Sequence, residues 1–147
     1  MSDVTVEHGR DHRMAPSGLV TSGVVELAAG ALSGWIYAAV RYDDDGARRL
    51  RIKSPARIRQ WHLDLVALGT GTVALGLAVP GAPKVVQRAL ATGAWTNAMM
   101  FLPLAYRPDL LQNPAYRKLG LASFISTSVG FTGMAISAVH RRRADRR

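Results

Sequence analysis

The chain contains no cysteine among its 147 residues. This absence excludes disulfide bonds, metal sites built from thiolates, and covalent haem attachment through a Cys-x-x-Cys-His motif. Acidic residues are also scarce, because 10 Asp and Glu stand against 19 Lys and Arg and leave a formal net charge of +9. The basic residues lie in loops and tails that flank apolar segments. That placement predicts contact with anionic lipid headgroups and no binding of nucleic acid.

Charged residues are absent from three long stretches and nearly absent from a fourth. Residues 65–83, 89–106 and 119–139 contain no Asp, Glu, Lys or Arg, and residues 14–40 contain only Glu26. A helix needs about 20 apolar residues to cross a bilayer, whereas a soluble helix of that length carries charges along one face. The sequence therefore predicts an all-α integral membrane protein, a bundle of four transmembrane helices. A compact soluble helical bundle is the alternative.

The predicted transmembrane domain covers residues 14–140 and is flanked by two tails. Its helices are expected over residues 17–40, 58–79, 85–106 and 117–140. Residues 1–13 form a polar N-terminal tail and residues 141–147 a basic C-terminal tail. The first apolar run is too long for a cleaved signal peptide and is retained as a helix. We expect a multi-pass protein of the inner (plasma) membrane of the cell, with both termini in the cytoplasm.

Small residues mark one face of the first and of the last predicted helix. Gly30 and Gly34 form a Gly-x-x-x-Gly motif, which lets helix backbones approach closely in lipid, within one subunit or between subunits. Glu26 shares that face, either as a proton-handling group or as a structural carboxylate paired with Arg88 of the third helix. The stripe on the last helix consists of Ser123, Ser126, Thr127, Gly130, Gly133 and Ser137.

The start of the second predicted helix carries ionisable and aromatic residues. Trp61 is predicted to anchor the helix at the membrane interface, where indole side chains are enriched. His62 has two interpretations, because a neutral imidazole can hydrogen-bond a neighbouring helix or serve as an axial ligand of haem iron. Asp64 is a candidate functional residue, since an ionisable group inside a membrane helix is costly.

Polar and aromatic residues of three predicted helices fall in one half of the bundle. Asn97 lies inside an apolar run, where its amide needs a partner or a ligand. It falls toward the end of the third helix, and His62 toward the start of the second, so both lie on the same side of the membrane. The residues placed together in this way are Trp35, Tyr37, His62, Asp64, Trp95 and Asn97. Their co-location predicts a pocket.

Short motifs in the second and third helices resemble those of small integral-membrane isomerases, namely styrene oxide isomerase and hydroxylaminobenzene mutase. They are Arg-x-x-His-x6-Gly, carried by Arg59, His62 and Gly69, and Trp-x-Asn, carried by Trp95 and Asn97. In the mutase pattern a His-Leu pair precedes an acid, which is similar to His62, Leu63 and Asp64. The resemblance covers residues 17–139.

The resemblance implies a haem b held between the subunits of a homotrimer, with His62 as the axial ligand. It also implies an intramolecular isomerase or mutase whose ferric iron acts as a Lewis acid on a small apolar aromatic oxygenated compound, in an epoxide or hydroxylamine rearrangement. The residues assigned to the substrate are Asn97, Asp64 and Tyr37, and those assigned to the cofactor are His62, Trp95 and Arg59.

Three positions depart from the isomerase pattern. Leu68, Gly93 and Phe101 stand where the isomerases have Asn, Asp and Tyr. Groups placed around a substrate steer its rearrangement, so their replacement by apolar or absent side chains favours a changed or lost reaction. The alternative is a non-catalytic binding or assembly subunit of the same fold. A transporter or channel component has less support, because helices two to four carry no ionisable group at mid-depth.

Overall fold

The computed structural model describes residues 15–147, and this part of the chain is helical with no strand. The elements are α1 (Gly18–Tyr42), α2 (Gly46–Arg49), α3 (Pro55–Ala78), α4 (Lys84–Met99), α5 (Phe101–Tyr106), η1 (Pro108–Gln112) and α6 (Pro114–Ala144). The predicted polar tail at residues 1–13 lies outside the described residues. Within the described part, α1, α3 and α6 are long and apolar enough to cross a membrane.

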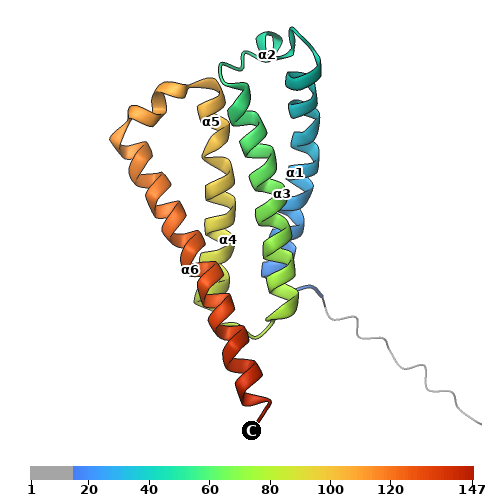
Figure 1. The fold of residues 1–147 in the computed structure, drawn as a ribbon, viewed down its shortest axis with the longest axis vertical. Coiled ribbons are helices and arrows are strands. Elements are labelled where there is room, and N and C mark those ends of the chain that lie inside the picture. Colours follow the sequence, from blue (N-terminus) through green and yellow to red (C-terminus); the bar gives the residue numbers. More distant parts are fainter. Residues whose placement is uncertain (1–14) are drawn as a thin grey trace, which may run out of the picture.

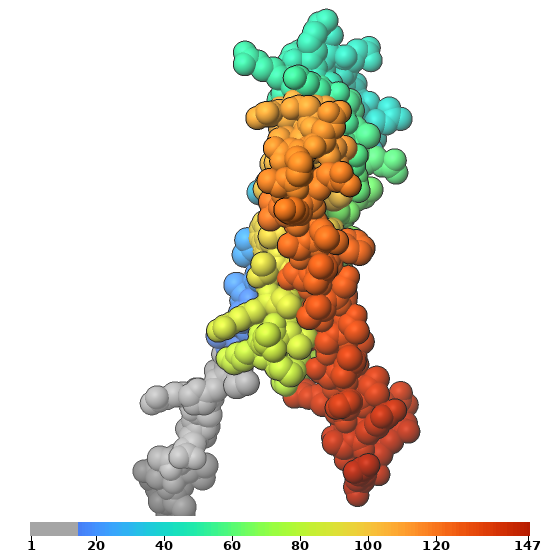
Figure 2. Space-filling view, turned by 90° about the vertical axis from the view of Figure 1, so that its left-hand side faces the viewer, coloured from blue at the N-terminus to red at the C-terminus, as the bar shows by residue number. Residues whose placement is uncertain are grey.

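The long helices stand side by side and run alternately up and down (Figure 1). Figure 1 places α2 and the α5–η1 turn at one end of the molecule, which we call the α2 end. The start of α1, the turn between α3 and α4, and the C-terminus lie at the opposite end. In the view turned by 90°, α6 covers the face toward the viewer over most of its length (Figure 2).

The third predicted helix, residues 85–106, is divided into α4 and α5 at Met100. Pro103 causes the division, because it has no N–H and its ring clashes with the carbonyl group four residues earlier, that of Met99. The interruption is one residue long, because the N–H of Met100 still donates to the carbonyl of Thr96, four residues earlier, and also approaches that of Ala98. The predicted third helix is therefore observed as two helical segments, and α5 continues roughly in line with α4 (Figure 1).

The last helix is longer at both ends than the predicted 117–140. Its start is fixed by Asn113, whose Oδ1 accepts hydrogen bonds from the N–H groups of Ala115 and Tyr116, and by Pro114 in the first turn. Its end extends through Arg141–Arg143 to Ala144, since cations in the last turn interact favourably with the helix dipole. Most of the predicted tail at residues 141–147 is thus helical.

Helices α1 and α3 pack with their backbones almost in contact. A Cβ atom at Gly23 would lie 2.8 Å from the backbone nitrogen of Val73, and one at Gly69 would lie 2.7 Å from that of Leu27. Gly30 faces Val66 in the same way. The predicted packing face of the first helix is confirmed, and its partner is α3 of the same chain.

Helices α4 and α6 form a second close pair. Gly93 lies against the backbone of Thr127, so no side chain fits there. Ser126 Oγ donates to the carbonyl of Ala89 at 3.0 Å, and the hydroxyls of Thr96 and Ser123 are 2.7 Å apart. The predicted small-residue stripe of the last helix is confirmed as the surface that packs on α4.

Trp61 lies in the hydrophobic core and not on the outer surface, where an interface anchor would lie. Its side chain is only 9% exposed, and it packs in a buried cluster near the α2 end that consists of Ile52, Ile58, Trp61, Leu65, Ala98 and Ala105. The connection before α3 closes over this cluster, because the N–H groups of Lys53 and Ser54 both donate to the carbonyl of Ala105. The anchor prediction was wrong because helix α3 turns this face toward α4 and α5.

Candidate functional site

His62 lies near the start of α3 and points its ring at α1. Its Nδ1 is 3.0 Å from the carbonyl oxygen of Gly30 and 3.0 Å from Ser33 Oγ. Ser33 Oγ in turn donates to the carbonyl of Gly30 at 2.6 Å. The imidazole is therefore held by two groups of one turn of α1.

These contacts fit the tautomer that carries its proton on Nδ1. A carbonyl oxygen only accepts, so a hydrogen bond between His62 and Gly30 is formed in that tautomer alone. In the neutral imidazole Nε2 then keeps its lone pair, and it accepts none of the hydrogen bonds formed within residues 15–147. An Nδ1–H bond to a backbone carbonyl is the usual arrangement of a histidine whose Nε2 binds a metal.

Tyr37 and Gly34 complete the surroundings of the imidazole. The rings of Tyr37 and His62 stack with their centroids 5.6 Å apart and an interplanar angle of 16°. A Cβ atom at Gly34 would lie 3.4 Å from Cε1 of His62, so glycine leaves the edge of the ring uncrowded. Tyr37 and His62 are both half-buried, and the site thus reaches the surface of the α1–α3 pair.

A cavity of about 240 Å³ opens next to this stack, between the end of α1 and the start of α3. It is lined by Tyr37, Val40, Arg41, Pro55, Ala56 and Arg59. Arg59 was predicted to lie beside a cofactor, whereas Arg41 was missed. The signal for Arg41 was its position one helical turn after Tyr37, which places both side chains on one face of α1.

Asp64 and Asn97 form a separate polar pair between α3 and α4. The amide Nδ2 of Asn97 donates to Asp64 Oδ2 at 3.4 Å. Asp64 follows His62 by two positions, and about 200° of rotation on a helix places the two side chains on nearly opposite faces. The sequence placed His62, Asp64 and Asn97 in one pocket; the structure brings Asp64 to Asn97 and turns His62 away from both.

The predicted tryptophans also lie apart from His62. Trp95 Nε1 donates to Ser22 Oγ at 3.1 Å, which directs the indole toward the first half of α1. Trp35 is 78% exposed on the outer face of α1. Of the residues expected to surround the histidine, only Tyr37 contacts its ring.

Glu26 is fully buried, and neither of its carboxylate oxygens has a hydrogen-bond partner in the described part of the chain. The expected ion pair with Arg88 does not form, because Arg88 is exposed on α4 and lines a surface cavity with Lys84 and Gln87. The reason is that α1 packs chiefly on α3 and makes little contact with α4. The ion pairs of residues 15–147 are Arg48–Asp45, Arg49–Asp43 and Arg107–Asp109.

The donor set at His62 suits a cofactor that brings most of its own metal ligands. No group of three or more His, Cys, Asp or Glu side chains that could hold a metal ion occurs within residues 15–147. A haem iron needs only one axial imidazole from the protein, because the porphyrin supplies the four equatorial nitrogens. Comparison with known proteins returns no matching family, no matching curated protein and no matching solved structure. The geometry of the site is therefore the basis for assigning its chemistry.

Proposed function

We propose that this chain is a multi-pass protein of the inner (plasma) membrane in which α1, α3, the α4–α5 pair and α6 each cross the bilayer. Residues 84–106 would span roughly 34 Å as a helix, enough for a hydrocarbon core of about 30 Å. The outward faces support insertion, because many large apolar side chains are exposed there, including Val24, Leu32, Trp35, Leu77, Leu121, Phe124, Ile125 and Val129. Both termini then lie on one side, which we assign to the cytoplasm.

The four crossings can be tested with single cysteines, because the native chain has none. We expect Asp44→Cys and Gln112→Cys to react with a membrane-impermeant maleimide in intact cells, and Pro80→Cys to react only after permeabilisation. All three positions are exposed. If the α4–α5 pair does not cross the bilayer, Gln112→Cys will react only after permeabilisation, as Pro80→Cys does, and the proposal of four crossings is wrong.

We also propose that His62 is the axial ligand of a haem b, as in the isomerases and mutases that the sequence resembles. The observation that carries this proposal is the hydrogen bond from Nδ1 of His62 to the carbonyl of Gly30, which leaves the lone pair of Nε2 available. Bound haem would supply a ferric Lewis acid for the oxygen of a small aromatic epoxide or hydroxylamine. Ser33 and Gly30 fix the ring and its tautomer, and Tyr37 supports one face of it.

A second copy of the chain is part of this proposal. The cavities next to Tyr37 and Asp64 measure about 240 and 280 Å³, below the range of about 300–1,000 Å³ typical of ligand sites. A porphyrin bound at His62 would therefore lie on the α1–α3 surface and need a cover from a neighbouring subunit. A homo-oligomer, a trimer by the resemblance, supplies that cover. Asp64 and Asn97, which face away from His62 in their own chain, are assigned to the substrate only across such an interface.

A non-catalytic binding or assembly subunit is the second candidate function. It is favoured by the separation of the Asp64–Asn97 pair from His62, because a rearrangement needs polar groups placed around the reacting atoms. Leu68 points to the same conclusion, since it is apolar where the isomerases have Asn. In this alternative the bundle binds haem or a partner and leaves the substrate unchanged.

The visible spectrum of the purified protein tests the haem proposal. After expression with haem supplied and purification in detergent, we expect a Soret band at a ratio of one haem per chain. A small aryl epoxide added to this sample should be converted to the isomeric aldehyde if the protein is an isomerase. A colourless protein would contradict the haem proposal, and a coloured but inactive protein would favour the binding subunit.

A further inference from the structure

We propose that Arg41 and Arg59 form a carboxylate-binding site beside His62, which we call the arginine clasp. The inference rests on the haem proposal and extends it, because haem b carries two propionate carboxylates at one edge of its ring. The clasp would bind those carboxylates at the water-facing end of the bundle while the apolar ring lies along α1 and α3. It thus assigns the orientation of the cofactor.

The two guanidinium groups come from neighbouring helices and line one cavity. Arg41 lies in the last turn of α1 and Arg59 in the second turn of α3, and both contribute to the cavity of about 240 Å³ that also includes Tyr37. Tyr37 belongs to the cavity wall and to the stack with His62, so the two sites are continuous. Arg59 precedes His62 by three positions, which is less than one helical turn, or about 4.5 Å along the axis.

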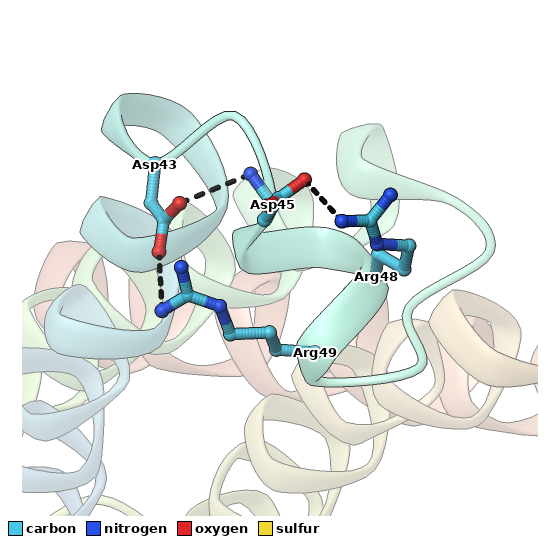
Figure 3. A network of polar contacts seen from close by, with 4 residues as sticks. All are labelled: Asp43, Asp45, Arg48 and Arg49. Atoms are coloured by element: carbon cyan, nitrogen blue, oxygen red, sulfur yellow. Dashed lines mark hydrogen bonds and ion pairs between the residues drawn. The ribbon is translucent and has the colours of Figure 1, made fainter.

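The clasp has no carboxylate partner within the described residues, although the adjacent loop contains three aspartates. Figure 3 shows two of them engaged elsewhere: Asp45 pairs with Arg48 at 2.7 Å, and Asp43 with Arg49 at 3.2 Å. Asp43 also accepts a hydrogen bond from the N–H of Asp45, which fixes the start of α2.

Arg41 and Arg59 therefore retain free donors for a ligand. The guanidinium of Arg41 lies 5.8 Å from the ring centre of Tyr42, an exposed contact that a carboxylate can displace. Arginine suits the role, because its planar donor pair matches both oxygens of a carboxylate.

Arg57 offers a matched control on the same helix. Its guanidinium donates to Gln60 Oε1 at 2.8 Å and lies over the ring of Phe101, on the side of α3 that faces α5. It carries the same charge at nearly the same depth but does not line the clasp cavity. Replacing Arg57 removes one positive charge, as each single substitution in the clasp does, and leaves the clasp intact.

The test compares haem with haem dimethyl ester, whose propionates are esterified and uncharged. Soret titrations of the detergent-purified protein should show that haem binds about tenfold more tightly than the ester at low ionic strength, with the difference shrinking as salt is added. In an Arg41→Gln/Arg59→Gln double variant the difference should vanish, and the affinity for the ester should stay unchanged. Arg57→Gln should keep the preference, and Arg41→Lys/Arg59→Lys should restore part of it.

The outcomes separate the clasp from the haem proposal. Equal binding of the two porphyrins by the native chain, or a preference that survives in the double variant, would overturn the clasp and leave His62 as the ligand. Loss of binding of both porphyrins in the double variant would also overturn it, because the effect would then not depend on the carboxylates. No Soret band with either porphyrin in the native chain would overturn the haem proposal and the clasp together.

Discussion

Substitution of Gly69 by valine should force α1 and α3 apart and strongly destabilise the protein. The first added carbon would lie 2.7 Å from the backbone nitrogen of Leu27 and 3.1 Å from the carbonyl oxygen of Gly23. Backbone atoms in the middle of a helix cannot rotate out of the way as a flexible side chain can. We expect a loss of about 3 kcal/mol in the free energy of unfolding, the upper end of the usual cost of overpacking. Thermal unfolding in detergent, followed by circular dichroism, measures it.

Gly18→Val is the control for this substitution. Gly18 begins the same helix α1, and a Cβ atom there meets nothing within 4 Å. The melting temperature of Gly18→Val should stay close to that of the native chain. Substitutions at surface positions usually change the free energy of unfolding by no more than about 0.5 kcal/mol. A Gly69→Val protein as stable as Gly18→Val would mean that α1 and α3 are not in close contact at this level.

Substitution of His62 by alanine should abolish the Soret band of the haem-loaded protein. In the proposed site the lone pair of Nε2 of His62 binds the iron. Removal of the imidazole therefore takes away the protein's bond to iron. We expect haem affinity to fall by at least about 100-fold, beyond the 10–100-fold typical of losing a supporting residue. The loss of haem affinity in Ser33→Ala should lie within the 10–100-fold range, because the ring of His62 keeps its hydrogen bond to Gly30 but loses the contact with the hydroxyl.

Two further measurements show whether the loss of the Soret band is due to the loss of the iron ligand at His62. His140→Ala changes an exposed histidine near the end of α6 and should leave the band unchanged. Free imidazole should restore part of the band to His62→Ala by entering the space that the side chain leaves. A Soret band of full intensity in His62→Ala would show that another group binds the iron, and the functional assignment of His62 would be wrong.

Helix positions followed from the distribution of charge, since the runs that contain no Asp, Glu, Lys or Arg, or Glu26 alone, make up most of α1, α3, α4–α5 and α6. The glycine-rich faces also predicted close packing correctly, because a residue without a side chain has few other uses inside an apolar helix. Boundaries were less accurate. The break at Met100 was missed although Pro103 was visible in the sequence, because a proline inside a helix can bend it, end it or divide it, depending on what packs around it.

The candidate site was predicted less well than the helices. Depth along the bundle placed His62, Asp64 and Asn97 at one level, and this says nothing about the direction in which each side chain points. The positions of His62 and Asp64, two apart on a helix, already indicated opposite faces. Trp61 was assigned to the interface from residue preference alone, and packing against Ala98 and Ala105 decided its burial.

The sequence by itself determined that this chain is helical, that its long helices are apolar on the outside, and that small residues bring pairs of them together. These properties follow from local composition and spacing. Only the tertiary structure decided that α1 faces α3, that Nδ1 of His62 lies opposite the carbonyl of Gly30, and that Arg41 joins Arg59 at one cavity. Such pairings join residues that lie far apart in the sequence, from Arg41 and Arg59 to Gly23 and Val73, and the interlocking of whole helix surfaces selects them.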